Sequence, residues 1–316
     1  TRVPLIDSCA GGEKIDLWVE AAANSLFGVF TDPDPAQESP KRHGWFDAKV
    51  EKMQVVIFDK ELWHLYLDVR ILLGLVKRLD EKSVRRSRAI LALNNCVNAF
   101  GDDLQRVKQA RECLKAELSK PASASDLNVA AIGHAHIDTG WLWPVRETVR
   151  KCARTYATQL SIIDNYPDYI FGASQPQHYQ FIKDNYPELY ERIKKAVKSG
   201  NWEAQGGMWV EADCNLISGE SMVRQLLHGK NFFRDELGVD VDNLWLPDVF
   251  GYSAALPQIL KKSGINYFLT QKLSWSQFNE FPHHTFNWRG IDGTEILTHF
   301  PPENTYNSEL DTEFLI

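Results

Sequence analysis

Apolar residues recur at helical spacing in three stretches between residues 59 and 119. Asp59 is expected to cap the first helix, Ser83 the second, and Asp102 or Asp103 the third. A stripe at this spacing is usually buried against other helices, so the pattern predicts a three-helix bundle. Residues 15–19 and 53–58 partly alternate between apolar and polar side chains and predict two short strands before it. The inward positions of the three helices are Leu62, Leu65, Tyr66, Val69, Leu72, Leu73 and Val76, then Ile90, Leu93 and Val97, then Leu104, Val107, Leu114 and Leu118.

A run of small residues with one proline, at 119–125, separates the helical pattern from the rest of the chain. Such composition between two patterned regions is typical of a linker. We therefore predict two domains. Residues 1–126 form a mostly helical domain with a few strands, and residues 127–316 form a second domain.

After the linker, short apolar runs alternate with amphipathic segments. Helices are expected between most of the strands, for example at 145–163 and 221–237. Strands that alternate with helices pair in parallel, which favours an α/β barrel or a doubly wound sheet. The predicted strands are 129–132, 169–173, 202–205, 244–246, 267–270 and 296–298.

Three potential metal ligands follow the first of these strands. Alternate residues of an extended chain face the same way, so His134, His136 and Asp138 are expected to converge at its carboxyl end. Active sites of α/β barrels are built at that end, and mixed imidazole and carboxylate donors suit zinc. The alternative is that these polar residues close the strand by hydrogen bonds. Three donors within five positions favour a metal.

A further carboxylate, Asp248, directly follows the apolar run 244–247. Aromatic residues flank it, and Gly251 permits a tight turn. Asp248 can act as a metal ligand, as a nucleophile, or as both. The alternative is that it caps the helix expected at 254–261. Its combination with the His136 and Asp138 motif favours the chemical role.

Composition narrows the class of protein. Of 316 residues, 35 are Lys or Arg and 42 are Asp or Glu, giving a formal net charge of −7. A mildly acidic chain without basic runs has no electrostatic reason to bind nucleic acid or an anionic membrane. No apolar stretch approaches the ~20 residues that span a bilayer. The five cysteines form no CxxC pair, which argues against a disulfide framework and favours the cytoplasm.

Three segments carry a family resemblance: HAHIDTGW at 134–141, GGMWVEAD at 206–213 and LWLPDVFGYS at 244–253. In this order and separation they resemble the class II α-mannosidases of glycoside hydrolase family 38. The stretches LPDVFGYSAALPQIL and TQKLSWS, the latter at 270–276, are similar to its cytosolic and bacterial branch, as is DLWVEAAAN at 16–24. The resemblance covers about 128–316 and implies a (β/α)7-type barrel.

The resemblance also implies an activity, namely zinc-dependent retaining hydrolysis of α-mannosidic linkages in oligosaccharides. It makes His136, Asp138 and Asp248 the metal ligands, with Zn2+ as the ion and Co2+ as the alternative. Asp248 would also be the nucleophile, and His134 would support the ligands from behind. The resemblance further implies that Trp141 stacks under the sugar ring and that Phe250 lines the same pocket. Lys272, by a looser match, would lie near the substrate.

The family also uses a further His ligand and an acid/base Asp downstream of the nucleophile, and this chain offers no matching residue. Glu211, Asp213 and Asp292 are nearby carboxylates that are more often structural. The remaining histidines give no assured ligand. We therefore expect a barrel that is incomplete at its carboxyl end and an isolated chain that is nearly inactive. The histidines in question are His178, His228, His283, His284 and His299.

Two other functions remain open from the sequence. A metal-dependent deacetylase or amidohydrolase also places an HxH pair at a strand end, with metal-bound water as its nucleophile. A non-catalytic fragment that binds carbohydrate is the other. Linkage preference and assembly into a homo-oligomer are not determined by the sequence.

Overall fold

The computed structural model describes residues 5–6, 8–16, 54–121, 129–305, 307–308, 310 and 312. Most of the strand predicted at 15–19 and the domain boundary predicted at 126–127 lie outside these residues. The strand predicted at 53–58 is wrong over its described part, because residues 54–58 have no regular secondary structure and are exposed. Contacts divide the chain into two compact units, 1–54 with 140–144 and 55–139 with 145–316.

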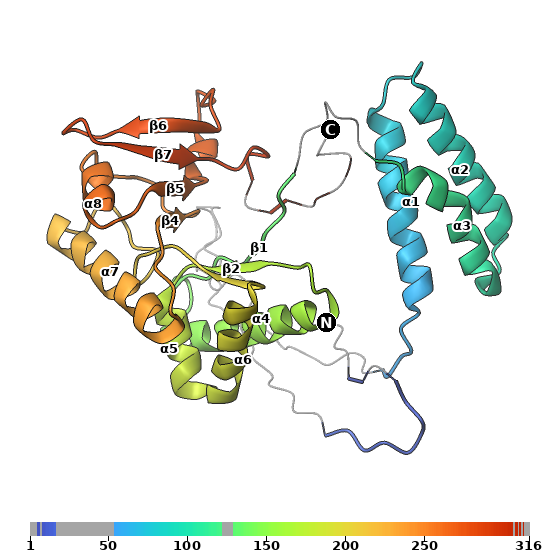
Figure 1. Ribbon diagram of the computed structural model, residues 1–316, viewed down its shortest axis with the longest axis horizontal. Helices are drawn as coiled ribbons and strands as arrows, with labels where there is room; N and C mark the ends of the chain where they lie inside the picture. The colour runs from blue at the N-terminus through green and yellow to red at the C-terminus, as the bar shows by residue number, and fades with distance from the viewer. Residues whose placement is uncertain are drawn as a thin grey trace, which may run out of the picture. The chain divides into compact units, whose positions relative to one another are not determined.

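Three helices follow (Figure 1), and the first two start directly after the predicted caps Asp59 and Ser83. They are α1 (Lys60–Arg78), α2 (Val84–Phe100) and α3 (Val107–Leu118), the last preceded by the 3-10 turn Leu104–Arg106. Asp59 accepts a hydrogen bond from the N–H of Leu62, and Asp103 accepts one from the N–H of Gln105. These bonds satisfy N–H groups that the first helical turn leaves unpaired. The helices share a core of Leu65, Leu72, Ala89, Ala92, Cys96, Val107, Ala110 and Leu114.

The rest of the described chain is a mixed α/β structure with two sheets. The first sheet has the order β1-β2-β3 and is parallel throughout, and the second has the order β4-β5-β7-β6. The strands are β1 (Gly133–His134), β2 (Phe171–Ala173), β3 (Trp202–Ala204), β4 (Asn243–Leu246), β5 (Tyr267–Thr270), β6 (Thr285–Arg289) and β7 (Glu295–His299). The helices are α4 (Val145–Asn165), α5 (Pro176–Asn185), α6 (Pro187–Ser199), α7 (Gly219–Phe232) continued by the π-helix Phe233–Leu237, α8 (Leu256–Lys262) and the 3-10 helix Lys272–Trp275.

Each sheet has its own apolar core. Around the first sheet, residues of α4, α5 and α6 pack on β2 and β3, with Trp202 and Tyr156 buried edge to face against each other. Around the second, α7 and α8 supply Leu226 and Leu256 against Leu244 and Leu246 of β4. Burial of one face of each helix explains why these amphipathic segments cover the sheets.

Two expectations about this region need correction. The first strand was predicted at 129–132, but the paired residues are Gly133 and His134. The antiparallel strand β6 was not predicted, and it makes the second sheet mixed. The alternation of helices and parallel strands confirms the α/β class. Neither sheet closes on itself within the described residues, so a barrel is not confirmed. None of the described helices is long and apolar enough to cross a bilayer.

Candidate metal and catalytic site

Within the described residues, one group of three side chains is arranged to hold a metal ion: His136, Asp138 and Asp248. One ligand atom from each lies within 4.8 Å of the others. His136 Nε2 is 3.1 Å from Asp138 Oδ1 and 3.6 Å from Asp248 Oδ2. All three side chains are partly exposed, so a ligand can reach them from solvent.

Strand pairing places Asp248 beside the carboxyl end of β5. Strands β4 and β5 run parallel with Leu246 opposite Thr270, so their carboxyl ends lie together. The hydroxyl of Tyr252 then anchors the turn, donating toward the carbonyls of Leu246 and Val249 and contacting the Thr270 hydroxyl. The α8 helix starts only at Leu256 and has no side-chain cap. The alternative that Asp248 caps this helix is therefore wrong.

Lys272 lies directly beside Asp248. Its Nζ is 2.7 Å from Asp248 Oδ1, and its side chain is only 9% exposed. The ammonium sits 3.5 Å from the ring centroid of Trp275 and 5.4 Å from that of Phe250, within the range of cation–π attraction. Phe250 and Trp275 are themselves largely exposed. The site therefore has an aromatic rim next to the carboxylate, and Trp275 was not identified from the sequence.

The other nitrogen of His136 faces a buried carboxylate. Its Nδ1 lies 2.6 Å from Glu211 Oε2, and the Glu211 side chain is 4% exposed. Burial lowers the pKa of His136, but the carboxylates of Glu211 and Asp138 outweigh it and raise the pKa to about 10. The ring thus lies among negative charges, which favour its protonated form when no metal ion is bound. From the sequence, Glu211 was considered only as a candidate general acid and judged more often structural.

His134 is not part of the metal cluster. Trp245 Nε1 donates to His134 Nε2 at 3.1 Å, so His134 Nδ1 carries the proton and donates to the carbonyl of Gly172 at 3.0 Å. Burial lowers the pKa of His134. Instead of contacting the ligands, this ring connects β1 to both β2 and β4. Asp138 follows the carboxyl end of β1, and Asp248 follows that of β4.

A chain of buried polar groups fixes the segment that follows β1. Thr139 donates its hydroxyl proton to Gln175 Oε1, so His178 Nε2 donates to the Thr139 oxygen. Gln175 Nε2 in turn donates to the carbonyl of Ile137. Burial lowers the pKa of His178 to about 3, which keeps its ring neutral. His178 is therefore committed to this network and is not a fourth ligand.

The remaining candidates from the sequence lie elsewhere. Asp213 accepts hydrogen bonds from the N–H groups of Asn215 and Leu216, and Asp292 accepts them from Thr294 in the β6–β7 turn. Asp213 and Asp292 therefore each accept hydrogen bonds from residues two or three positions ahead in the chain. Trp141 belongs to the other compact unit, is 55% exposed and packs edge to face on Trp143. Its stacking role stays a prediction.

The donors fit a divalent cation. Asp138, Asp248 and Glu211 supply three carboxylates, and Lys272 supplies one ammonium, which leaves two negative charges before the imidazole of His136 is counted. Buried and half-buried charges of one sign are costly unless they are compensated. Nitrogen and oxygen donors of this kind are those of zinc sites. Cobalt accepts similar donors, so the geometry does not select between these ions.

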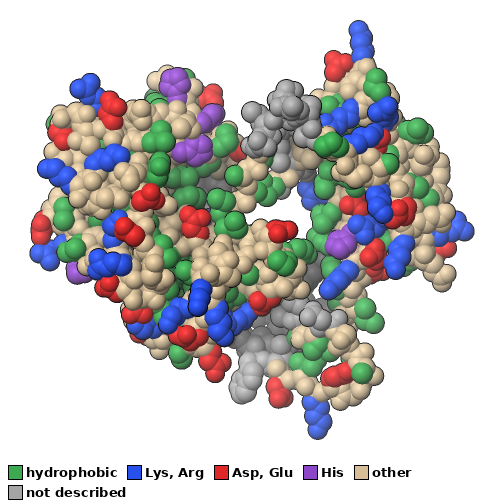
Figure 2. Space-filling view, in the orientation of Figure 1, with side chains coloured by type: hydrophobic (Ala, Val, Ile, Leu, Met, Phe, Trp, Pro, Cys, Tyr) green, Lys and Arg blue, Asp and Glu red, His purple; other side chains and the backbone are tan. Residues whose placement is uncertain are grey.

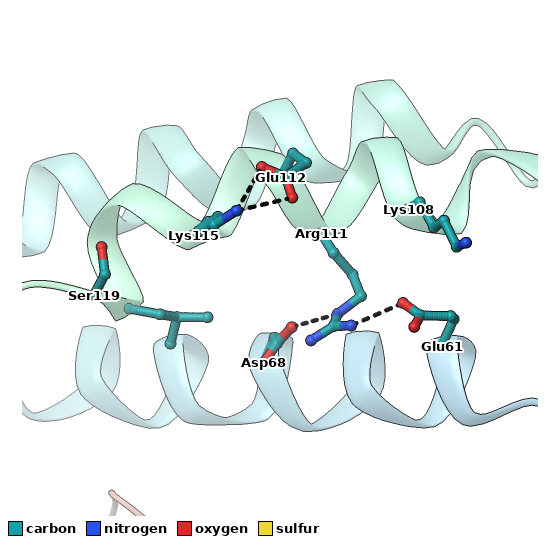
Figure 3. Close-up of a pocket in the computed structure, with 8 residues that line it drawn as sticks. Glu61, Asp68, Lys108, Arg111, Glu112, Lys115 and Ser119 are labelled. Carbon is teal, nitrogen blue, oxygen red and sulfur yellow. Dashed lines mark hydrogen bonds and ion pairs between the residues drawn. The ribbon is translucent and has the colours of Figure 1, made fainter.

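A cleft of about 570 Å3 lies between α1 and α3, away from this site (Figure 3). Its acids and bases pair with one another, for example Arg111 with both Glu61 and Asp68. The face in Figure 2 likewise shows acidic and basic side chains interspersed over the described chain. Paired charges of this kind stabilise helices and provide no single-sign field for a ligand.

The chain is similar in sequence to known proteins. Residues 126–315 match the N-terminal domain of the glycosyl hydrolases family 38. The chain is 43% identical over 314 residues to alpha-mannosidase G of Dictyostelium discoideum, covering 99% of this chain and 28% of that protein. It is 41% identical over 301 residues to alpha-mannosidase 2C1 of Homo sapiens, covering 95% of this chain and 29% of that protein.

Alpha-mannosidase of Saccharomyces cerevisiae is 38% identical over 334 residues, covering 98% of this chain and 30% of that protein. The chain therefore spans less than a third of the length of these relatives. The match covers both segments that carry the metal cluster, namely the residues after β1 and after β4. The chain belongs to family 38 of the glycosyl hydrolases.

Proposed function

We propose that this chain is the metal-binding catalytic region of a retaining α-mannosidase. The observation that carries the proposal is the meeting of His136, Asp138 and Asp248, with Lys272 against the second oxygen of the same Asp248 carboxylate. The relatives are named alpha-mannosidases, so α-mannosides are the substrate class of those proteins. An α-mannoside is therefore the proposed substrate here.

Asp248 is the proposed nucleophile. Its two oxygens have different surroundings, since Oδ2 faces His136 and Oδ1 faces Lys272. In a retaining glycosidase a carboxylate attacks the anomeric carbon and forms a covalent glycosyl-enzyme, which water then hydrolyses. Lys272 holds the attacking group in one orientation, and orientation of this kind lowers the barrier. Asp248 thus serves as both ligand and nucleophile.

His136, Asp138 and Asp248 would hold the ion, for which we propose Zn2+ with Co2+ as the alternative. When bound, such an ion acts as a Lewis acid that binds vicinal hydroxyls and favours ring distortion. Mannose presents its axial 2-hydroxyl and its 3-hydroxyl as a cis pair, whereas glucose does not. Phe250 and Trp275 offer apolar surface for a sugar ring beside the carboxylate, and Trp141 is retained as a further stacking residue.

The acid that protonates the leaving oxygen is not assigned. A retaining enzyme needs a second carboxyl ~5–5.5 Å from the nucleophile and open to the substrate. Glu211 does not meet this requirement, because it is buried and faces His136 Nδ1.

The finer architecture and location are proposals as well. We propose that both sheets belong to one (β/α)7-type barrel, because β1, β2 and β3 are parallel and the His134–Trp245 bond joins β1 to β4. We propose that the boundary between the helical domain and the metal-binding region lies at 126–127. A cytoplasmic location is supported by the five cysteines, which are all free thiols.

Covalent trapping tests the mechanism. The enzyme that contains this chain is incubated with a 2-deoxy-2-fluoro or 5-fluoro mannosyl fluoride, and its peptides are mapped by mass spectrometry. A mannosyl adduct on Asp248, absent from Asp248→Asn, is the expected result. A hydrolase that uses activated water, such as a deacetylase, would give no adduct. A carbohydrate-binding fragment would show no turnover of an aryl α-mannoside in any form of the protein.

A further inference from the structure

We propose that Glu211 is a positioning residue that fixes the ring orientation and the Nδ1–H tautomer of His136, so that Nε2 is presented to the ion. This inference rests on the metal site of the proposed function. Glu211 lies in the loop after β3, far in sequence from both ligand-bearing segments. It is the buried carboxylate that contacts His136.

The two ring nitrogens of His136 face different partners. Nδ1 lies 2.6 Å from Glu211 Oε2, whereas Nε2 lies 3.1 Å from Asp138 Oδ1. The Glu211 contact is short but does not meet the geometry of a regular hydrogen bond, and both atoms are buried without another hydrogen-bond partner among the described residues. A neutral imidazole carries one proton. A carboxylate that accepts it at Nδ1 leaves the Nε2 lone pair for a metal.

Glu211 is itself held in place. The Ser174 hydroxyl donates to Glu211 Oε1 at 2.6 Å, and the Glu211 N–H donates to Gln175 Oε1 at 3.1 Å. The same Gln175 side chain donates to the carbonyl of Ile137, between the two predicted ligands of its segment. One amide therefore connects the loop of Glu211 to the segment of His136. One bond fixes the carboxylate and the other fixes the backbone of Glu211, so the carboxylate can orient the ring it contacts.

The close approach of these segments is built into the backbone. Gly206, which ends the extended chain after β3, has φ of +98° and no room for a side chain, since an added Cβ would lie 2.6 Å from the Ser174 carbonyl oxygen. The pairing of β2 with β3 sets the same proximity. Ser174 and Glu211 thus meet because two parallel strands end side by side.

Two other roles for Glu211 fit less well. A general acid must reach the substrate, but the Glu211 side chain is 4% exposed. A direct ligand would have to share the ion with His136 Nε2, but Glu211 contacts the opposite ring nitrogen. The remaining alternative, a carboxylate that only stabilises the fold, predicts no change in the tautomer of a folded protein.

The test measures metal affinity and tautomer in the full chain. Zn2+ affinity is obtained by competition with a chromophoric chelator, and the His136 tautomer by long-range 1H–15N correlation of the Zn2+-loaded protein, assigned with His136→Ala. Glu211→Gln keeps an acceptor and should weaken Zn2+ binding about 10-fold while retaining the Nδ1–H tautomer. Glu211→Leu removes the acceptor and should weaken binding about 100-fold with mixed tautomers. Ser174→Ala, which leaves the carboxylate, should weaken binding less than Glu211→Gln.

The matched control is Glu147→Gln. Glu147 is also a buried carboxylate, but it pairs with Arg150 and Arg154 on α4. The affinity of the Glu147→Gln variant for Zn2+ should stay within about twofold of that of the wild type. Thermal unfolding of each variant checks the fold, and if Glu211→Leu does not fold, Glu211→Gln and Ser174→Ala decide the result.

The outcomes separate this inference from the one on which it depends. If the wild-type protein binds Zn2+ no better than His136→Ala does, the proposed metal site is wrong. The role proposed for Glu211 is then wrong as well. Wild-type binding that Glu211→Gln and Glu211→Leu leave unchanged, with the Nδ1–H tautomer intact, would overturn the role of Glu211 alone. Graded loss with mixed tautomers in Glu211→Leu supports it.

Discussion

Lys272 Nζ lies 2.7 Å from Asp248 Oδ1, and each residue stands two positions beyond a paired residue of its strand. Leu246 of β4 is opposite Thr270 of β5, and both strands run in the same direction. Parallel pairing therefore carries the two side chains to the same edge. The aromatic ring of Trp275 lies against the ammonium and limits its orientations.

Replacing Lys272 should impair turnover more than substrate binding. In Lys272→Met the Asp248 carboxylate loses the cation that orients it, and we expect kcat to fall about 100-fold. Lys272→Arg keeps the charge and should retain more activity. Both are measured with an aryl α-mannoside on the enzyme that contains this chain. Lys262→Met, at the exposed end of α8, is the control, and equal activity of the Lys262 and Lys272 variants would contradict the assignment.

The losses caused by Asp248→Asn and His136→Ala should not add. Asp248→Asn removes the proposed nucleophile and one ligand atom, while His136→Ala removes another ligand of the same ion. Groups that act as a unit give double variants no worse than the more damaging single one. Steady-state turnover and zinc content by elemental analysis test this. Multiplicative losses would mean that His136 and Asp248 act independently.

The His134–Trp245 bond should stabilise the fold. Trp245→Phe removes the donor and leaves His134 Nε2 without it, which we expect to lower the free energy of unfolding by about 1–3 kcal/mol. A double-mutant cycle with His134→Leu should give a coupling energy above ~0.5 kcal/mol. Urea unfolding of the four proteins provides the values. Additive effects would show that the contact does not link β1 to β4 energetically.

His178 should make the protein less stable in mild acid. Its pKa is about 3 in the folded protein against 6.5 for the unperturbed group, so between these values the unfolded chain binds the extra proton. Stability is therefore fully present above pH 6.5 and falls as the pH falls toward 3. Between pH 7 and pH 5 the loss from this group should be about 2 kcal/mol.

His178→Gln should remove that part of the slope, because glutamine does not titrate in this range. Urea unfolding at pH 7 and pH 5 gives the difference for each protein. His228→Gln, at a histidine on α7 outside this network, serves as the control. Parallel slopes for wild type and His178→Gln would show that His178 is protonated equally in both states.

Local signals were sufficient where the deciding interactions are local. Asp59 and Ser83 begin helices because their side chains bond to N–H groups three residues ahead. The first strand was misplaced because residues 129–132 are apolar, whereas pairing with β2 begins only at Gly133. The antiparallel β6 escaped prediction because its partner β7, and not its own composition, makes it a strand.

The sequence by itself determined the family, through three motifs in register, and with it the identities of His136, Asp138 and Asp248 as the residues to watch. It also determined the helical caps and most strands. Only the tertiary structure decided what surrounds those residues. Lys272 on Asp248, Glu211 on His136 and Trp245 on His134 are contacts between segments far apart in the chain. They depend on strand order and register, which local patterns do not encode.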